Sequence, residues 1–288
     1  MRVTNGMMVS NLMNNLQNNM ERLDEHNRQL STGKKFDVPS DDPTGAVRSM
    51  SLNTTISNNE QYVKNSDEGL LWLQTTDEAL SQASKVLERT RELVVYGAND
   101  TLSAIDRKGI KDEIVELKEN LTEIANSNIN GRYLFSGNKT LNEPYPTSDS
   151  DYKGDYGEIS LEVSYGTELT INQNGSFFKD LLDELSNIAD NLDNNPSKLS
   201  DENLENLDIS TDKMLSIRAE NGAKQKRLEL TKDRLEKDYI KFKNLLSKNE
   251  DVDIAETIMN LKMSENVYRA ALSSGSRIIQ PSLVDFVK

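Results

Sequence analysis

Residues 9–30 have the sequence VSNLMNNLQNNMERLDEHNRQL. Apolar residues recur in this stretch at alternating steps of four and three, which places them on one side of an α-helix. The predicted seam consists of Val9, Met13, Leu16, Met20, Leu23 and Leu30, with Asn27 as its one polar interruption. We expect a helix over residues 7–31 that ends at Gly33. Because isolated amphipathic helices are marginally stable in water, this helix needs a partner.

The other end of the chain carries a second seam with the same spacing. Its predicted members are Ile254, Ile258, Leu261, Tyr268 and Leu272. Gly275 is the predicted end of this last helix, and the apolar tail behind it includes Ile279, Leu283 and Phe286. We therefore expect the two ends of the chain to pack against each other and against neighbouring subunits.

A turn-rich connector follows the first helix and contains Ser40, Asp41, Asp42 and Pro43. Two adjacent carboxylates can suggest acid–base catalysis. Here Asp42 stands directly before a proline, which is the arrangement of a helix N-cap followed by proline at the first helical position. Capping is the favoured interpretation of this acidic pair.

Long helical patterns fill most of the remaining chain. They cover about residues 44–98, 177–192 and 200–247. A further helix is predicted to begin after an N-cap at Ser103. Asn130-Gly131 predicts a tight turn, and short alternating segments such as 159–163 and 169–171 predict strands.

This nested order predicts three parts. Residues 1–42 with 250–288 form a terminal helical assembly domain. Residues 43–137 with 177–249 form a central helical bundle, and residues 138–176 form a small β-rich surface insertion. We expect deletion of residues 140–176 to preserve assembly.

Composition excludes several classes of function. The chain has 288 residues, a net charge of −14 and a mean hydropathy of −0.68. It has no basic patch for a nucleic acid and no apolar run long enough for a membrane helix. Cysteine is absent, which excludes thiol catalysis and disulfides. The single histidine, His26, is expected on the surface, and no residues group into a catalytic, metal-binding or cofactor-binding set. With no apolar signal segment at its start, the chain is cytoplasmic by default.

Several motifs resemble the bacterial flagellin superfamily. They lie at residues 1–5, 29–35, 39–46 and 130–137, and in the C-terminal stretch 276–286. The Ser-Asp-Asp-Pro form of the connector and the C-terminal stretch resemble the subunits of the hook–filament junction more than filament flagellins. The resemblance covers about residues 1–137 and 200–288.

The resemblance implies a mainly α fold: an elongated flagellin-like helical bundle with paired terminal helices and a small β-rich inserted domain. It implies export, unfolded, through the flagellar type III channel to the outside of the cell, which replaces the cytoplasmic default. The implied partners are hook-associated protein 1, flagellin, further copies of the chain in a ring, and an export chaperone on the C-terminal helices.

Three alternatives remain open. The nearest is a flagellin, the filament subunit itself. A coiled-coil signalling protein is disfavoured by the lack of a transmembrane segment and by the β-rich region. An enzyme is disfavoured because no residues converge into a catalytic set.

Overall fold

The computed structural model describes residues 5–99, 102–147, 151–194 and 198–279. Contacts divide the chain into two units. The terminal unit comprises residues 1–58 with 239–288, and the central unit comprises residues 59–238. The helices are α1 (Asn5–Thr32), α2 (Pro43–Gly97), α3 (Ala104–Ala125), α4 (Phe177–Asn194), α5 (Leu204–Glu250) and α6 (Ile254–Ile279). Both α2 and α5 have residues in each unit.

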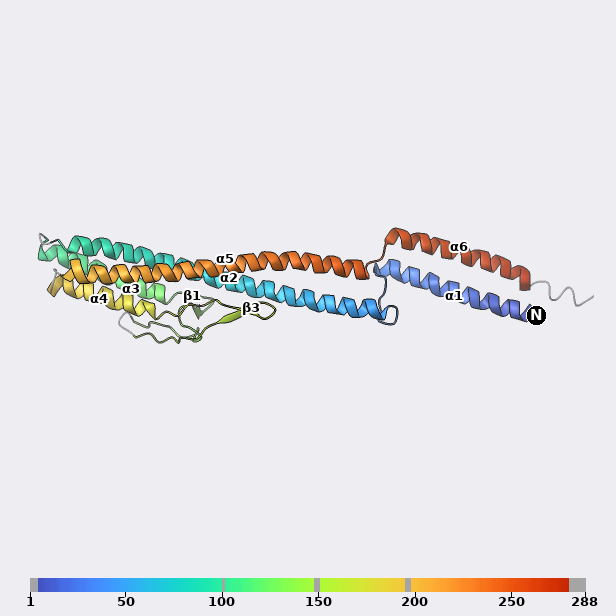
Figure 1. The fold of residues 1–288 in the computed structure, drawn as a ribbon, viewed down its shortest axis with the longest axis horizontal. Helices are drawn as coiled ribbons and strands as arrows, with labels where there is room; N and C mark the ends of the chain where they lie inside the picture. Colours follow the sequence, from blue (N-terminus) through green and yellow to red (C-terminus); the bar gives the residue numbers. More distant parts are fainter. Residues whose placement is uncertain (1–4, 100–101, 148–150, 195–197, 280–288) are drawn as a thin grey trace, which may run out of the picture. The chain divides into compact units, whose positions relative to one another are not determined.

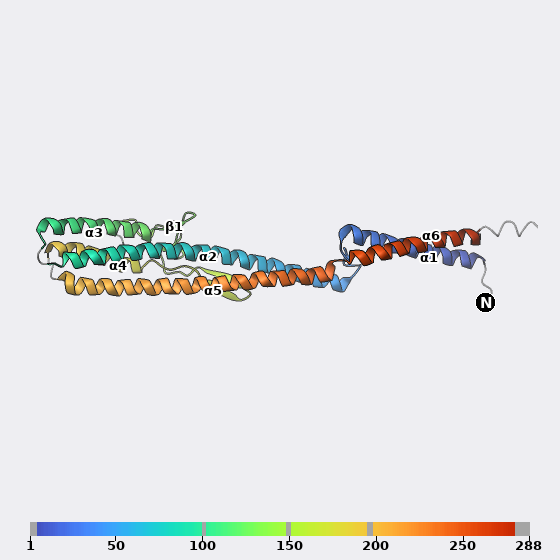
Figure 2. The ribbon, with the colours of Figure 1, turned by 90° about the horizontal axis from the view of Figure 1, so that it is seen from above.

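In the central unit, α3 and α4 lie beside the unit's portions of α2 and α5 (Figures 1 and 2). Leu73, Leu80, Leu87 and Val94, which are spaced by seven residues, are at most 1% exposed and form the buried seam of α2. Helix α3 begins at the predicted cap. The Ser103 hydroxyl accepts a hydrogen bond from the Asp106 N–H, and the Asp106 carboxylate accepts one from the Ser103 N–H.

Two short antiparallel hairpins follow α3. The first pairs β1 (Asn128–Ile129) with β2 (Arg132–Tyr133), and the second pairs β3 (Ser160–Ser164) with β4 (Thr167–Thr170). Asn130 and Gly131 connect β1 to β2 with φ values of 51° and 77°. Two successive residues with positive φ form the turn that matches strand twist, so the predicted Asn-Gly turn is confirmed.

The region 138–176 is more than a surface insertion. Tyr145, Val163, Leu169 and Ile171 belong to the same buried apolar cluster as the helices of the central unit. The Tyr145 ring is fully buried, its hydroxyl donates to the Gly175 carbonyl at 2.8 Å, and burial raises the pKa of this phenol above its usual range. Side chains from the predicted insertion 138–176 therefore form part of the core of the central unit.

Helix α5 differs from its predicted form in two respects. A π-helical turn, η1 (Leu199–Asn203), precedes it, and its apolar residue Leu215 is 48% exposed rather than buried. The turn places Asn203 beside the buried Glu184, whose carboxylate accepts a hydrogen bond from the Asn203 amide at 2.8 Å. Satisfying this buried carboxylate offsets the cost of its burial.

Candidate assembly surface

In the terminal unit, α1 and α6 lie side by side and run in opposite directions (Figures 1 and 2). Leu12 near the start of α1 lies against Gly275 near the end of α6, whereas Lys34 just beyond α1 forms a bridge with Asp251 just before α6. Helices α1 and α6 therefore pair along their lengths within a single molecule.

Gly275 does not end the last helix, contrary to the sequence prediction. Helix α6 continues to Ile279, and Gly275 is buried within it. A Cβ atom at this position would lie 2.5 Å from Leu12 Cδ2, so the glycine allows the two helices to approach closely. Its role is in packing rather than in capping.

The packed face of α1 contains some predicted residues and excludes others. Val9, Leu16, Leu23 and Leu30 are half-buried. Met13 and Met20 are 58% and 55% exposed. Two heptad registers share the four half-buried residues, and the structure uses the register whose other members are Leu12, Asn19 and His26. His26 is thus half-buried rather than on an exposed face.

Fewer of the predicted residues of α6 lie in the contact. Leu261 and Tyr268 are half-buried, whereas Ile254, Ile258 and Leu272 are 60%, 46% and 46% exposed. Among the described side chains of α6, the remaining half-buried or buried positions are small or polar, at Thr257, Asn260, Ser264, Glu265, Ala271 and Gly275. Of the predicted tail, Ile279 is helical without a described side chain, and Leu283 and Phe286 lie outside the described residues.

Large apolar side chains therefore remain exposed on both sides of the α1–α6 contact. On α6 they include Met259, Met263 and Val267, which are 62%, 60% and 47% exposed. Contiguous exposed apolar surface of this kind marks interaction surfaces in soluble proteins. A single molecule leaves much of the apolar surface of its terminal helices uncovered.

The connector is organised by its acidic pair. Asp42 Oδ1 accepts hydrogen bonds from the Thr44 and Gly45 N–H groups at 3.1 and 2.9 Å, and α2 begins at Pro43, which confirms the predicted N-cap. Asp41 accepts from the Arg28 guanidinium at 2.9 Å. Ser40 is exposed. Asp42 therefore binds backbone N–H groups and Asp41 binds a guanidinium, so the two carboxylates do not form a common catalytic site.

A second set of contacts joins the connector to the turn between α5 and α6. Gly33 ends α1 with a φ of 72°, and its carbonyl accepts from the Val252 N–H at 3.0 Å. The Lys34 ammonium pairs with the Glu250 carboxylate at 2.9 Å, and this hydrogen bond raises the pKa of Lys34. These contacts hold the C-terminal end of α1 close to the N-terminal end of α6.

Sequence reasoning missed two residues that hold this region, Asn249 and Phe36. Asn249 donates to the Gly45 carbonyl at 2.9 Å and to Ser49 Oγ at 2.7 Å. Phe36 is buried, and a Cβ at Gly45 would lie 2.7 Å from its ring. Because the start of α2 and the end of α5 pack with the connector, the terminal unit extends beyond the predicted parts 1–42 and 250–288. In the sequence, the aromatic Phe36 within a polar connector could have indicated that the connector packs against other elements.

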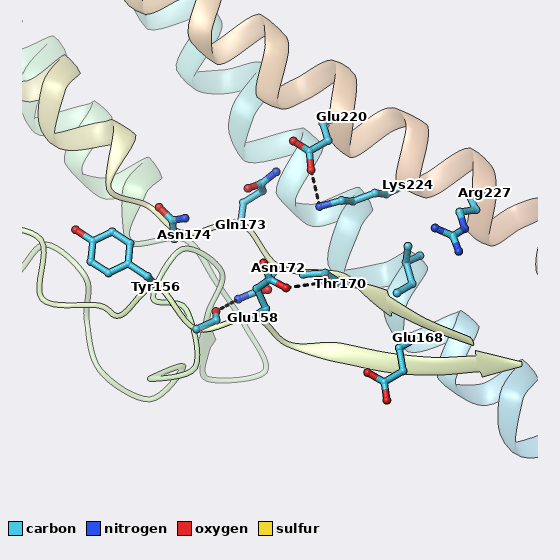
Figure 3. A pocket seen from close by; sticks show the side chains of 12 residues that line it. Tyr156, Glu158, Glu168, Thr170, Asn172, Gln173, Asn174, Glu220, Lys224 and Arg227 are labelled. Carbon is cyan, nitrogen blue, oxygen red and sulfur yellow. Dashed lines mark hydrogen bonds and ion pairs between the residues drawn. The ribbon is translucent and has the colours of Figure 1, made fainter. Parts of the chain in front are cut away.

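The central unit has a polar hollow of about 380 Å³ between β4 and the face of α5 that carries Glu220, Lys224 and Arg227 (Figure 3). Some of the charged side chains that line it already have ion-pair or hydrogen-bond partners within the hollow. Lys224 pairs with Glu220 at 2.8 Å, and Thr170 donates to Glu158 at 3.3 Å. The mixed charges do not select a ligand of either sign.

Within residues 5–99, 102–147, 151–194 and 198–279, no three His, Cys, Asp or Glu side chains group closely enough to hold a metal ion. Over those same residues, every helix falls short of the length and apolarity needed to cross a membrane.

Comparison with known proteins identifies relatives of these helices. Residues 3–140 match the model of the bacterial flagellin N-terminal helical region. The flagellar hook-associated protein 3 of Escherichia coli is 30% identical over 176 residues, which are 61% of this chain and 56% of that protein. A flagellin of Bacillus subtilis is 28% identical over 96% of this chain and 94% of its own length. The chain thus spans little more than half of the first relative.

Solved structures show the same fold. Bacillus cereus FlgL superposes with a TM-score of 0.62 at 23% identity, over 68% of this chain and 99% of that one. The flagellar hook associated protein-3 of Legionella pneumophila gives a TM-score of 0.63 at 16% identity, over 68% and 97%. Residues 3–140 thus resemble the flagellin N-terminal helical region, and the chain shares the fold of these solved structures.

Proposed function

We propose that the chain is a structural subunit of the bacterial flagellum at the junction between hook and filament. The observation that carries this proposal is the exposed apolar surface beside the α1–α6 contact, joined to the similarity to hook-associated protein 3. Burying such surface between subunits is favourable, at about 25 cal/mol per Å² of apolar area removed from water. A protein that acts by assembly needs this surface and needs no catalytic set.

The proposed assembly surface keeps the predicted residues and adds those that the fold brings to it. Met13, Met20, Ile254, Ile258 and Leu272 are exposed in the single chain and would be covered by neighbouring subunits. Val9, Leu16, Leu23, Leu30, Leu261 and Tyr268 would support them through the α1–α6 contact. The tail residues Ile279, Leu283 and Phe286 remain proposed members.

The proposed partners follow from the superfamily resemblance. Copies of the chain would form a ring, with hook-associated protein 1 on the hook side and flagellin on the filament side. The chain would reach this place through the flagellar export channel, with an export chaperone on its C-terminal helices. The assembled protein would lie outside the cell.

Location is the decisive test. Immunogold labelling of whole cells should give one band where the hook meets the filament, and cells that lack the chain should keep hooks and lose attached filaments. Label along whole filaments would refute the junction role.

A flagellin is the second candidate, because the Bacillus subtilis flagellin aligns over 94% of its own length. The purified chain distinguishes the two roles. A filament subunit should polymerise alone into long filaments visible by electron microscopy, whereas a junction subunit should not.

A further inference from the structure

Methionine is distributed unevenly between the two units. The chain has nine methionines, of which Met1 lies outside the described residues. Seven of the others belong to the terminal unit and are between 42% and 68% exposed. They are Met7, Met8, Met13, Met20, Met50, Met259 and Met263. The eighth, Met214, belongs to the central unit and is 1% exposed.

Exposed thioethers react with peroxides. The sulfur lone pair attacks one peroxide oxygen, the O–O bond breaks, and a new S–O bond forms a sulfoxide. The sulfur loses two electrons, and the peroxide is reduced and leaves as water after a proton transfer. The chain contains no cysteine to compete for the oxidant, so exposed methionines are its most reactive sulfur groups.

We propose that the seven exposed methionines form an oxidation-sensitive modification site, at which peroxide-class oxidants stop the terminal unit from packing against neighbouring subunits. The loss of packing rests on the proposed assembly function, whereas the pattern of oxidation does not. Methionine sulfoxide is chemically reversible, because methionine sulfoxide reductases convert it back to methionine.

The position of these residues explains the expected effect. Met13 and Met20 stand beside the half-buried seam of α1, and Met259 and Met263 lie on α6, where the neighbouring Ile258 and Val267 are also exposed. Methionine suits such a surface because its flexible side chain adapts to different partners. A sulfoxide is strongly polar, so covering it without a hydrogen-bond partner is unfavourable.

Met214 provides an internal control for accessibility. Its sulfur is buried among α2 and α5 residues and accepts a hydrogen bond from Ser84 Oγ at 3.4 Å. Peroxide reaches it only when the central unit opens. In the folded chain, Met214 should oxidise more than ~10-fold more slowly than the seven exposed residues.

The first experiment is a time course of the full chain with hydrogen peroxide, followed by peptide mapping for the gain of one oxygen at each methionine. Early oxidation at the seven exposed positions with Met214 spared supports the inference. Oxidation of Met214 at a similar rate, with the Trp72 fluorescence of the folded central unit unchanged, would overturn it.

The second experiment measures incorporation into flagella of cells that lack the chain. Wild type is compared before peroxide, after peroxide, and after peroxide followed by methionine sulfoxide reductases. We expect peroxide to abolish incorporation and the reductases to restore it. Incorporation that survives peroxide, or a loss that the reductases do not restore, contradicts the inference. If untreated wild type is not incorporated into flagella, the proposed function is refuted instead. The peptide map of oxidised methionines then tests the selectivity of oxidation by itself.

Discussion

The terminal and central units share the same type of helix but differ in how completely they bury it. In the described part of the terminal unit, the buried apolar residues are Phe36, Ala46 and Ile56, all in or near the connector and α2. The central unit buries five aromatic side chains, Trp72, Phe135, Tyr145, Phe177 and Phe178, together with apolar residues from α2, α3, α4, α5 and the second hairpin. Its apolar core is shielded from water, whereas apolar side chains on both sides of the α1–α6 contact are exposed.

This difference indicates where stability and assembly reside. A closed core stabilises a unit by itself, because its apolar surface is removed from water on folding. A two-helix contact with small and polar residues in its seam is far weaker, and its remaining apolar surface is available to other molecules. Single changes should therefore act on folding in one unit and on assembly in the other.

The largest effect is expected from deleting residues 140–176. The sequence alone led us to expect that assembly would survive this deletion. The structure predicts the opposite, because Tyr145, Val163, Leu169 and Ile171 are lost from the core. The cooperative unfolding transition followed by Trp72 fluorescence should disappear. Tyr165→Ser, at an 89% exposed hairpin residue, is the control and should change stability by less than ~0.5 kcal/mol.

Placing a charge on either terminal helix should separate assembly from folding. Ile258→Asp changes an exposed residue, so it should leave the helix content of the free chain unchanged and block incorporation into flagella. Leu16→Asp changes a half-buried residue, so it should also reduce helix content in far-UV circular dichroism. Both variants should keep the Trp72 transition of wild type. Normal filaments on cells carrying Ile258→Asp would contradict the assembly surface.

The close approach of α1 and α6 can be tested at Gly275. Gly275→Ala should destabilise their contact by about 1–3 kcal/mol, because the new Cβ meets Leu12. Circular dichroism should report this loss while Trp72 fluorescence remains constant. Gly6→Ala, which has open space around it, is the matched control. Adding Leu12→Ala to Gly275→Ala should relieve the overlap, and a double variant that is no more stable than Gly275→Ala would argue against it.

Removal of the helix cap should have a smaller effect. Asp42→Ala loses two hydrogen bonds to the first turn of α2 and should cost about 1 kcal/mol. Thermal melting followed by circular dichroism would measure it. Asp42→Asn keeps a cap acceptor and should recover most of the stability, whereas an equal loss in both variants would exclude capping as the cause.

The smallest effect is the pH dependence of the Lys34–Glu250 pair. Pairing raises the pKa of Lys34 in the folded chain. The stabilisation is therefore fully present below the unfolded pKa of about 10.4 and is lost as pH rises through the higher folded value. Lys34 is about half exposed, so the effect should stay below ~1 kcal/mol. Lys34→Met should remove this alkaline loss in thermal melts, and an unchanged alkaline loss in the variant would assign it to another group.

The sequence by itself determined the order and approximate limits of the helices. The heptad spacing of α2, the Ser103 capping box, the Asn130-Gly131 turn and the Asp42 cap depend on local geometry, so each was predictable from a few neighbouring residues.

Only the tertiary structure decided which faces meet. In the structure, α1 packs in the register that contains Leu12, Asn19 and His26. The alternative register with Met13 and Met20 is more apolar, but Gly275 allows Leu12 to pack against α6 at close range. The tertiary structure also placed Tyr145 and the second hairpin in the core, through contacts with helices distant in sequence. Periodicity describes one helix at a time, whereas register and burial depend on the shape of the partner.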